Sequence, residues 1–202
     1  MQKDKIVLLG LIAAVAIAAA IGINLALAYL PPAGGSSGSA EIGGPFVLVD
    51  DTGKEVTQAT LAGKPSVIYF GYTFCPEVCP TTLANLSHWI RDLGPEADKL
   101  NYVFVTVDPE KDTPKVMHQY VASFDKRIRG FTGTPAQIAK IAKEYRVYYK
   151  RIPTKDGGYV MDHTAFLYLM NAQGDFVGTI DYQEKDSSAL SKLKRLAEAA
   201  GS

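Results

Sequence analysis

The longest apolar stretch of the chain lies near its N-terminus. Residues 6–30 contain no charged side chain and almost no polar one. About 20 apolar residues are enough to cross a bilayer, so this stretch is long enough for a transmembrane helix. Lys3 and Lys5 precede it, and the next cation along the chain is Lys54. The positive-inside rule therefore predicts a cytoplasmic segment over 1–5, a transmembrane anchor over 6–30 and an exported C-terminal domain.

A cleaved signal peptide is the alternative explanation of this stretch. Ala26-Leu27-Ala28 is a pattern that a signal peptidase could accept. A usual signal core has about 7–15 apolar residues, so the greater length favours the anchor. Both explanations export the domain, and the chain lacks an Arg-rich, Ser-rich presequence of the mitochondrial type. We therefore expect a single-pass protein of the bacterial inner membrane, with its domain on the periplasmic side.

Short apolar runs and helical periodicity alternate in the rest of the chain. Residues 31–44 are rich in Pro, Gly, Ser and Ala and predict a flexible linker. Residues 45–202 then have the usual size of one domain. The apolar runs predict a hairpin formed by 46–49 and 54–57, followed by strands over 66–71, 101–107, 165–170 and 176–180. Helical spacing and Thr-Pro helix starts predict helices over 80–93, 113–124, 134–145 and 187–200.

The order of these elements indicates the fold class. Strands that are joined through helices usually pair in parallel, and strands joined by a tight turn pair antiparallel. The turn at 171–175 makes the last two strands an antiparallel pair. We therefore predict a thioredoxin-like α/β fold with an N-terminal β-hairpin and an insertion. In such sheets functional sites form at the carboxyl ends of the central strands, here after residue 71.

Charge and cysteine content narrow the chemistry. The 202 residues carry 21 Lys and Arg against 21 Asp and Glu, and this balance argues against a surface for nucleic acid. The two cysteines are Cys75 and Cys79. A structural disulfide is the simplest interpretation in an exported protein, but a bridge over so short a loop adds little stability. Redox or metal chemistry is favoured, because a helix start stabilises thiolates.

Several segments of the chain resemble the SCO/SenC family. The most specific is the cysteine loop, Phe70-Gly71-Tyr72-Thr73-Phe74-Cys75-Pro76-Glu77-Val78-Cys79-Pro80, in which Glu77 stands where the family usually has aspartate. The other segments are 107–114, 131–135, 145–149 and 160–165. They follow in the family's order, and the resemblance covers about 45–199. It implies a thioredoxin-like fold and a copper site.

The resemblance implies that Cys75, Cys79 and His163 bind copper. Two thiolates and an imidazole form a soft, three-coordinate set that suits Cu(I), and the same set can accept Cu(II) with a weak fourth ligand. Zinc also accepts two cysteines and one histidine, so ligand type alone leaves that metal open. We expect His163 on a loop that is mobile without metal.

Other candidate residues have more than one interpretation. His88 and His118 are expected to be solvated or packed rather than ligands, and Met161 is expected to fill the core rather than serve as an axial ligand. Asp108 and Asp112 match two aspartates of a family segment. They either cap the following helix or, as the resemblance suggests and as we favour, lie beside the metal site or dock a partner.

The resemblance implies a copper metallochaperone rather than an enzyme. Its recipient is the copper A site in subunit II of cytochrome c oxidase, and a periplasmic copper donor upstream would load it. The alternative is a thiol-disulfide oxidoreductase that uses Cys75 and Cys79 as a catalytic pair to reduce the oxidase cysteines. Thioredoxins have two residues between their cysteines and a proline where this chain has His163, so the alternative is weaker. A peroxiredoxin-type peroxidase is disfavoured, because neither cysteine follows a Thr or Ser by three residues.

Overall fold

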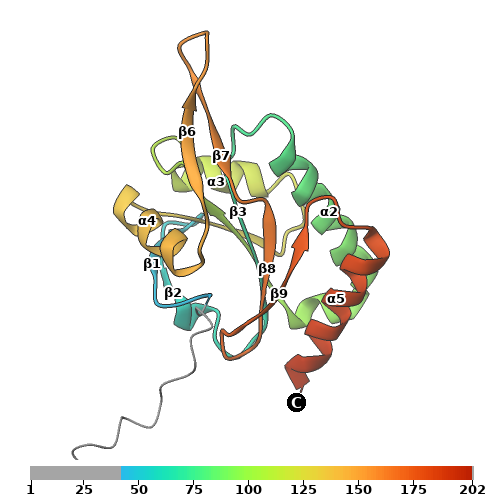
Figure 1. The fold of residues 1–202 in the computed structure, drawn as a ribbon. Helices are drawn as coiled ribbons and strands as arrows, with labels where there is room; N and C mark the ends of the chain where they lie inside the picture. Colours follow the sequence, from blue (N-terminus) through green and yellow to red (C-terminus); the bar gives the residue numbers. More distant parts are fainter. Residues whose placement is uncertain (1–41, 202) are drawn as a thin grey trace, which may run out of the picture. The chain divides into compact units, whose positions relative to one another are not determined.

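The computed structural model describes residues 42–201 of the chain (Figure 1). These residues contain the predicted domain from its first strand to its last helix. The predicted cytoplasmic segment and anchor, and most of the predicted linker, lie outside the described residues. No helix within 42–201 is both long and apolar enough to cross a membrane.

A seven-stranded sheet forms the centre of the domain. Its strands are β1 (Val47–Asp50), β2 (Glu55–Thr57), β3 (Ser66–Gly71), β4 (Asn101–Thr106), β5 (Ile128–Thr132), β8 (Phe166–Met170) and β9 (Phe176–Asp181). Their order is β2-β1-β5-β4-β3-β8-β9, with β3, β4 and β5 parallel and antiparallel pairs at both edges. Every residue of β3 is buried, as expected for a strand covered on both faces. The predicted hairpin and mixed α/β, thioredoxin-like layout are thus confirmed.

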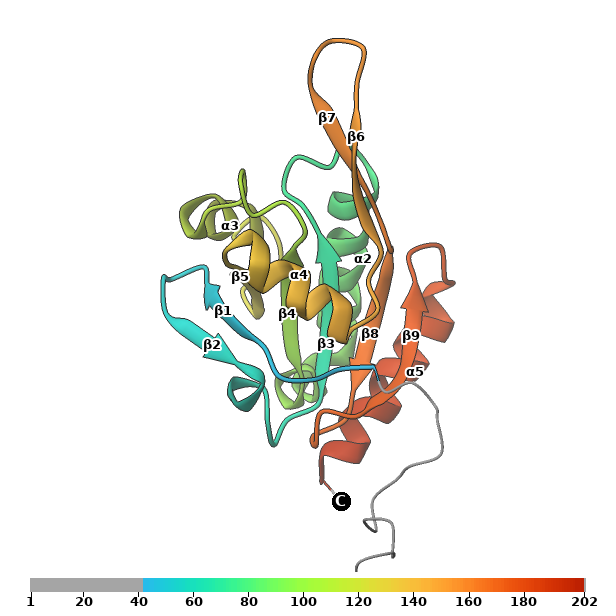
Figure 2. The same ribbon diagram turned by 60° about the vertical axis from the view of Figure 1, so that its left-hand side comes forward.

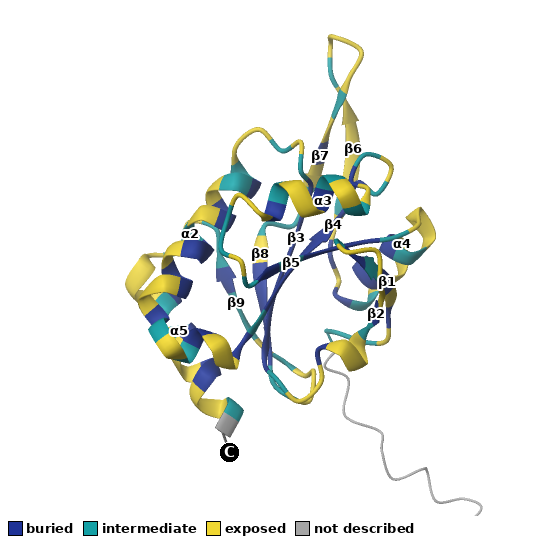
Figure 3. Ribbon diagram, turned by 180° about the vertical axis from the view of Figure 1, so that it is seen from behind, coloured by how far each residue is buried: buried dark blue, intermediate teal, exposed yellow. Residues whose placement is uncertain are grey.

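Helices cover both faces of this sheet. They are α2 (Val78–Leu93), α3 (Pro114–Val121), α4 (Pro135–Glu144) and α5 (Asp186–Glu198). α2, α3 and α5 lie on one face and α4 lies on the other (Figures 2 and 3). As predicted, α3 and α4 begin at Thr-Pro pairs, and the hydroxyls of Thr113 and Thr134 accept hydrogen bonds from amides of the first turns.

Aromatic side chains at neighbouring positions of β3 point to opposite faces of the sheet. Tyr69 stacks on Phe104 of β4, with ring centroids 5.9 Å apart, on the face that α2 and α3 cover. Phe70 packs against Tyr145 and Tyr168 on the face that α4 covers, at 5.4 and 5.7 Å. Tyr69 and Phe70 have no exposed surface. This packing fixes the end of β3 just before the cysteine loop.

The sequence pattern does not predict β5 or the strands β6 (Tyr149–Pro153) and β7 (Tyr159–His163). β5 reads Ile-Arg-Gly-Phe-Thr, and its Arg and Gly obscure an apolar run that is nevertheless largely buried. β6 and β7 form a separate two-stranded sheet that projects from the domain (Figure 1). β6 is mostly exposed, so burial imposes no apolar pattern on it. His163 ends β7, which corrects the expectation that it lies on a loop.

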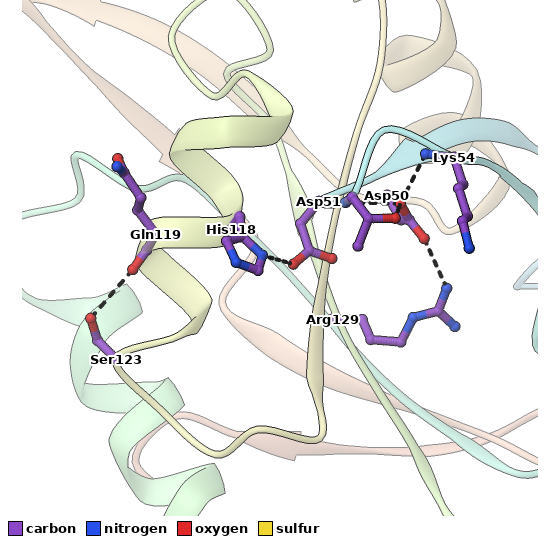
Figure 4. A network of polar contacts seen from close by, with 8 residues as sticks. Asp50, Asp51, Lys54, His118, Gln119, Ser123 and Arg129 are labelled. Atoms are coloured by element: carbon purple, nitrogen blue, oxygen red, sulfur yellow. Dashed lines mark hydrogen bonds and ion pairs between the residues drawn. The ribbon is translucent and has the colours of Figure 1, made fainter.

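A polar network fixes the end of β1 against β5 and α3 (Figure 4). The buried carboxylate of Asp50 accepts hydrogen bonds from backbone amides of the following turn and from Arg129 of β5. The neighbouring Asp51 contacts His118 of α3, with Oδ2 2.9 Å from Nδ1. His118 is therefore engaged by a carboxylate rather than by the cysteines, in line with its expected role.

Candidate metal centre

Two sulfurs and one imidazole nitrogen meet at the carboxyl end of β3. Cys75 lies in the loop after β3, Cys79 lies in the first turn of α2, and His163 ends β7. Their ligand atoms all lie within 4.8 Å of one another, and His163 Nε2 is 3.4 Å from Cys79 Sγ. Within residues 42–201, no other group of His, Cys, Asp and Glu side chains is arranged to share a metal ion. The structure thus brings together the three residues that the resemblance singles out.

The contacts between the cysteines favour a thiolate at Cys75. The Cys79 thiol donates a hydrogen bond to the Cys75 sulfur, and this contact lowers the pKa of Cys75 well below its usual value. The backbone N–H of Cys79, which is 3.3 Å from the sulfur, acts in the same direction, and these contacts outweigh burial. The contact with Cys75, together with burial, raises the pKa of Cys79. Without metal the pair therefore combines a charged, half-buried Cys75 with a neutral, buried Cys79.

The imidazole of His163 is held in one tautomer. Its Nδ1 lies 2.9 Å from the carbonyl oxygen of Thr164, and a carbonyl oxygen can only accept a hydrogen bond. Nδ1 therefore carries the proton, and Nε2 faces the sulfurs with a free lone pair. Tyr69 and Tyr72 make T-shaped contacts with the ring, at centroid distances of 6.4 and 5.8 Å. A backbone acceptor on the far nitrogen is typical of metal-ligating histidines.

Asp112 fixes the loop that carries the cysteines. Its carboxylate is fully buried and accepts hydrogen bonds from the Thr73 amide at 3.1 Å and from the hydroxyls of Thr73 and Thr106 at 2.5 and 2.6 Å. Burial raises the pKa of Asp112, although these donors act in the opposite direction. Because Thr73 shortly precedes Cys75, Asp112 determines the path of the loop as it leaves β3.

Asp108 contacts the hairpin that carries His163. Its carboxylate is 1% exposed and accepts a hydrogen bond from the hydroxyl of Tyr159, with oxygen–oxygen distances of 2.9 and 3.1 Å. The helix cap at α3 is supplied by Thr113 and not by Asp108 or Asp112. The two aspartates therefore hold the two halves of the site, one at the cysteine loop and one at the hairpin.

The remaining candidates lie outside this group. His88 contacts Asp92 at 3.5 Å on the exposed face of α2, and Met161 is buried in the core, as expected. Sequence reasoning missed Tyr159, because its local pattern does not distinguish it from other tyrosines of the chain. The proximity of Tyr159 to Asp108 depends on the fold of the hairpin.

The donor set fits a copper ion. Two sulfurs and one unprotonated imidazole nitrogen make a soft, three-coordinate site suited to Cu(I), and zinc can use the same donors. Metal binding requires both cysteines as thiolates, so it displaces the proton of Cys79. Cys75 is half-buried and its neighbour Phe74 is 61% exposed, so the site borders solvent on the side of Cys75.

Comparison with known proteins finds one family along most of the chain. The family described as SCO1/SenC matches residues 34–198. Protein SenC of Rhodobacter capsulatus is 34% identical over 187 residues, which cover 88% of this chain and 83% of that protein. Protein SCO1 homolog 1, mitochondrial, of Arabidopsis thaliana is 42% identical over 145 residues, 71% of this chain and 43% of that protein. The chain spans about half the length of several mitochondrial relatives that it matches.

Solved structures share both the fold and substantial sequence identity. The structure of Bradyrhizobium japonicum ScoI with copper bound is 52% identical, with a TM-score of 0.72, covering 77% of this chain and 99% of that chain. The structure of yeast Sco1 with copper bound is 35% identical, with a TM-score of 0.73, covering 79% of this chain and 90% of that one. With the family match and the site of two cysteines and one histidine, these similarities show that the chain belongs to the SCO1/SenC family.

Proposed function

We propose that this protein is a copper chaperone that supports assembly of the copper A site in subunit II of cytochrome c oxidase. The observation that carries the proposal is the convergence of Cys75, Cys79 and His163 within 4.8 Å. Relatives at 52% and 35% identity are described with copper bound. Sco proteins are described as cytochrome c oxidase assembly proteins, which supports the recipient.

The residues of the site suit loading with Cu(I). Cys75 is already a thiolate and half-buried, so it is the first ligand that an incoming ion meets. Cys79 then gives up its proton, and His163 Nε2 completes the set without a change of tautomer. Asp112 and Asp108 hold the loop and the hairpin in place. Loading therefore needs one proton release and little rearrangement.

The same arrangement suits release to an acceptor with free thiolates. An acceptor thiolate can approach from the solvent side of Cys75 and displace the ligands of the metal one after another. Exchange through shared thiolates keeps the ion bound throughout, so no free copper is produced. A periplasmic donor upstream can load the site by the same exchange in reverse.

We propose that residues 6–30 anchor the protein in the bacterial inner membrane and that residues 31–44 tether the domain on the periplasmic side. The apolar run and the preceding lysines support this topology. A tether beside a membrane-bound oxidase raises the effective concentration of the domain at its recipient.

The direct test measures Cu(I) binding by the full-length protein in detergent. Competition with a chromophoric Cu(I) chelator gives the affinity, and X-ray absorption gives the ligands. We expect one copper with two sulfur ligands and one imidazole. Cys75→Ser, Cys79→Ser and His163→Ala are each expected to weaken binding by at least about tenfold, equivalent to about 1.4 kcal/mol.

His118→Ala is the matched control for the histidine, because His118 is engaged by Asp51 on α3. Its copper affinity is expected to equal that of the parent. Cysteine and histidine variants that all hold one copper as firmly as the parent would show that the proposed site is wrong.

A thiol-disulfide oxidoreductase is the second candidate function. It is favoured by one observation, the thiolate character of the half-buried Cys75 beside the thiol of Cys79. In this reaction Cys75 would attack a substrate disulfide, and Cys79 would then resolve the mixed disulfide and leave Cys75 and Cys79 bridged. Reduction of an oxidized copper A peptide by the His163→Ala variant at the parental rate would favour this function, because that reaction needs no imidazole ligand.

A further inference from the structure

The strand that carries His163 presents every second side chain to the body of the domain. In β7, Tyr159 and His163 are half-buried and Met161 is buried, whereas the intervening Val160 and Asp162 are exposed. This alternation is the normal period of a strand with one covered face. The inward residues contact separate parts of the domain, so this face of β7 is the surface through which the hairpin packs on the domain.

Each inward residue of β7 has its own partner. Tyr159 donates a hydrogen bond to Asp108 after β4. Met161 packs in the hydrophobic core of the domain. His163 lies against Cys79. Because β7 pairs with β6 and not with the central sheet, these contacts, rather than a ladder of backbone hydrogen bonds, set the position of β7.

Tyr159 makes the most polar of these contacts, and its geometry is tightly defined. Its hydroxyl reaches both oxygens of Asp108, a carboxylate with 1% exposure. Its ring lies between two cations, with Lys111 Nζ 3.8 Å and Arg151 Cζ 4.1 Å from the centroid. Arg151 also bonds Glu110 at 2.7 Å, which ties β6 to the same loop. A buried carboxylate needs such donors, and loss of the hydroxyl would leave Asp108 with only the longer ion pair between its Oδ1 and Arg151 Nη2 at 3.7 Å.

We propose that Tyr159 is a positioning residue for the metal site: its bond to Asp108 sets the angle of β7 and thereby the place of the His163 imidazole relative to the two sulfurs. His163 follows Tyr159 by about 13 Å along an extended strand. Both residues lie on the inward face of one strand, so a twist of β7 about its own axis that releases Tyr159 also turns the imidazole away from the sulfurs. The inference rests on the proposed function, because it assigns a residue that governs the copper affinity of that site.

The first test is Tyr159→Phe in the full-length protein, which removes the hydroxyl and keeps the ring between Lys111 and Arg151. Cu(I) affinity is expected to fall by about tenfold or more, as when other partners behind metal ligands are removed. In the Cu(II) form, the nitrogen couplings of the imidazole in electron paramagnetic resonance are expected to weaken. Tyr148→Phe is the matched control, because Tyr148 lies at the base of the same hairpin and is 53% exposed. It is expected to leave both readouts unchanged.

A second test separates positioning from a general effect on stability. In a His163→Ala background, Tyr159→Phe is expected to cause no further loss of copper affinity, because the imidazole through which Tyr159 acts is gone. An equal loss in both backgrounds, or no loss in the single variant, would overturn the inference. In either case the parent protein still binds copper, so the proposed function stands.

A third test needs no metal. Amide hydrogen exchange in β7 of the metal-free protein is expected to be faster in Tyr159→Phe than in the parent, with the exchange of β3 unchanged. Parental exchange rates throughout β7 would overturn the inference. A parent protein that binds no copper would instead overturn the proposed function, and this exchange experiment would still decide the role of Tyr159.

Discussion

Gly71 lies directly against the sulfur of Cys79. A methyl group at Gly71 would come within 2.9 Å of Cys79 Sγ and within 2.8 Å of the Phe104 ring. The backbone at Gly71 cannot retreat easily, because its carbonyl accepts a hydrogen bond of 2.7 Å from the Val107 amide. The missing side chain therefore lets the first turn of α2 bring its cysteine down onto the end of β3.

Replacing Gly71 by Ala is therefore expected to damage both the fold and the site. Overpacking at this position should lower the free energy of unfolding by about 1–3 kcal/mol. The displaced sulfur should also weaken Cu(I) binding. Gly130→Ala is a matched control in β5, where the new methyl would meet the Met117 side chain at 3.1 Å. Urea denaturation is expected to show that this variant loses stability. Chelator competition is expected to show that it keeps its copper affinity. Equal copper affinities for Gly71→Ala and the parent would contradict this account.

Removal of the Asp112 carboxylate is expected to loosen the cysteine loop. Asp112→Ala leaves the amide and hydroxyl of Thr73 and the hydroxyl of Thr106 without their buried acceptor. Unsatisfied buried groups cost about 1–3 kcal/mol each, so urea denaturation should show a loss of at least that size. Asp92→Ala is the control, because Asp92 is an exposed partner of His88 and should change stability by less than about 0.5 kcal/mol. A similar, small change in both variants would show that Asp112 does not hold the loop.

Strong local patterns explain which parts could be predicted from the sequence. β3 is buried at every position, so it reads as a continuous apolar run. α2 buries Leu83, Leu86, Trp89 and Ile90 at helical spacing. Cys75 and Cys79 lie at the junction of these two elements, so the position of both cysteines in the fold could be predicted from the sequence. The N-terminus of α2 at Val78 rather than Pro80 is the kind of small shift that terminal turns usually show.

Contacts over long distances in the chain explain what could not be predicted. Cys79 and His163 are 84 positions apart in the chain, no local pattern links them, and only the family resemblance connected the two. Tyr159 and Asp108 are 51 residues apart and meet through the β6–β7 hairpin. β6 is mostly exposed, and in β7 the apolar Val160 is exposed whereas His163 is half-buried, so neither strand shows the alternation of apolar and polar residues on which sequence reasoning depends.

The pH dependence of stability is expected to reveal the anchoring of β1 by Asp50. Burial on its own would raise the pKa of Asp50, but hydrogen bonds from Thr52, the Lys54 amide and Arg129 outweigh it, so the pKa lies below its ordinary value of 3.8. A carboxyl with a lowered folded pKa stabilises the fold above its unfolded pKa, and this contribution is lost as the pH falls through the folded value. The parent should therefore lose stability below about pH 3.8 in part through Asp50.

Asp50→Asn tests this assignment by urea denaturation at neutral and acidic pH. The variant is expected to be less stable than the parent at neutral pH, by about 1–3 kcal/mol, and this difference should shrink as the pH falls below the ordinary value of 3.8. Thr52→Val removes only one donor and should reduce the pH dependence in part. A difference between parent and Asp50→Asn that stays constant over the whole range would show that Asp50 does not titrate with folding.

Copper loading is expected to make the β6–β7 hairpin more rigid. Without metal, side-chain contacts alone hold β7 to the domain, whereas a bound ion would join His163 directly to Cys75 and Cys79. Any opening that separates β7 from the cysteine loop must then break the metal site.

At a free Cu(I) concentration about 1,000 times the Kd, such an opening costs about 4 kcal/mol more. Amides of β7 that exchange through this opening should slow by up to about three orders of magnitude, whereas those of β1 and β2 serve as the internal control and should not change. His163→Ala should abolish the effect, because β7 then has no ligand. Equal exchange in metal-free and copper-loaded protein would mean that the imidazole is not a ligand, even if the two sulfurs still hold copper.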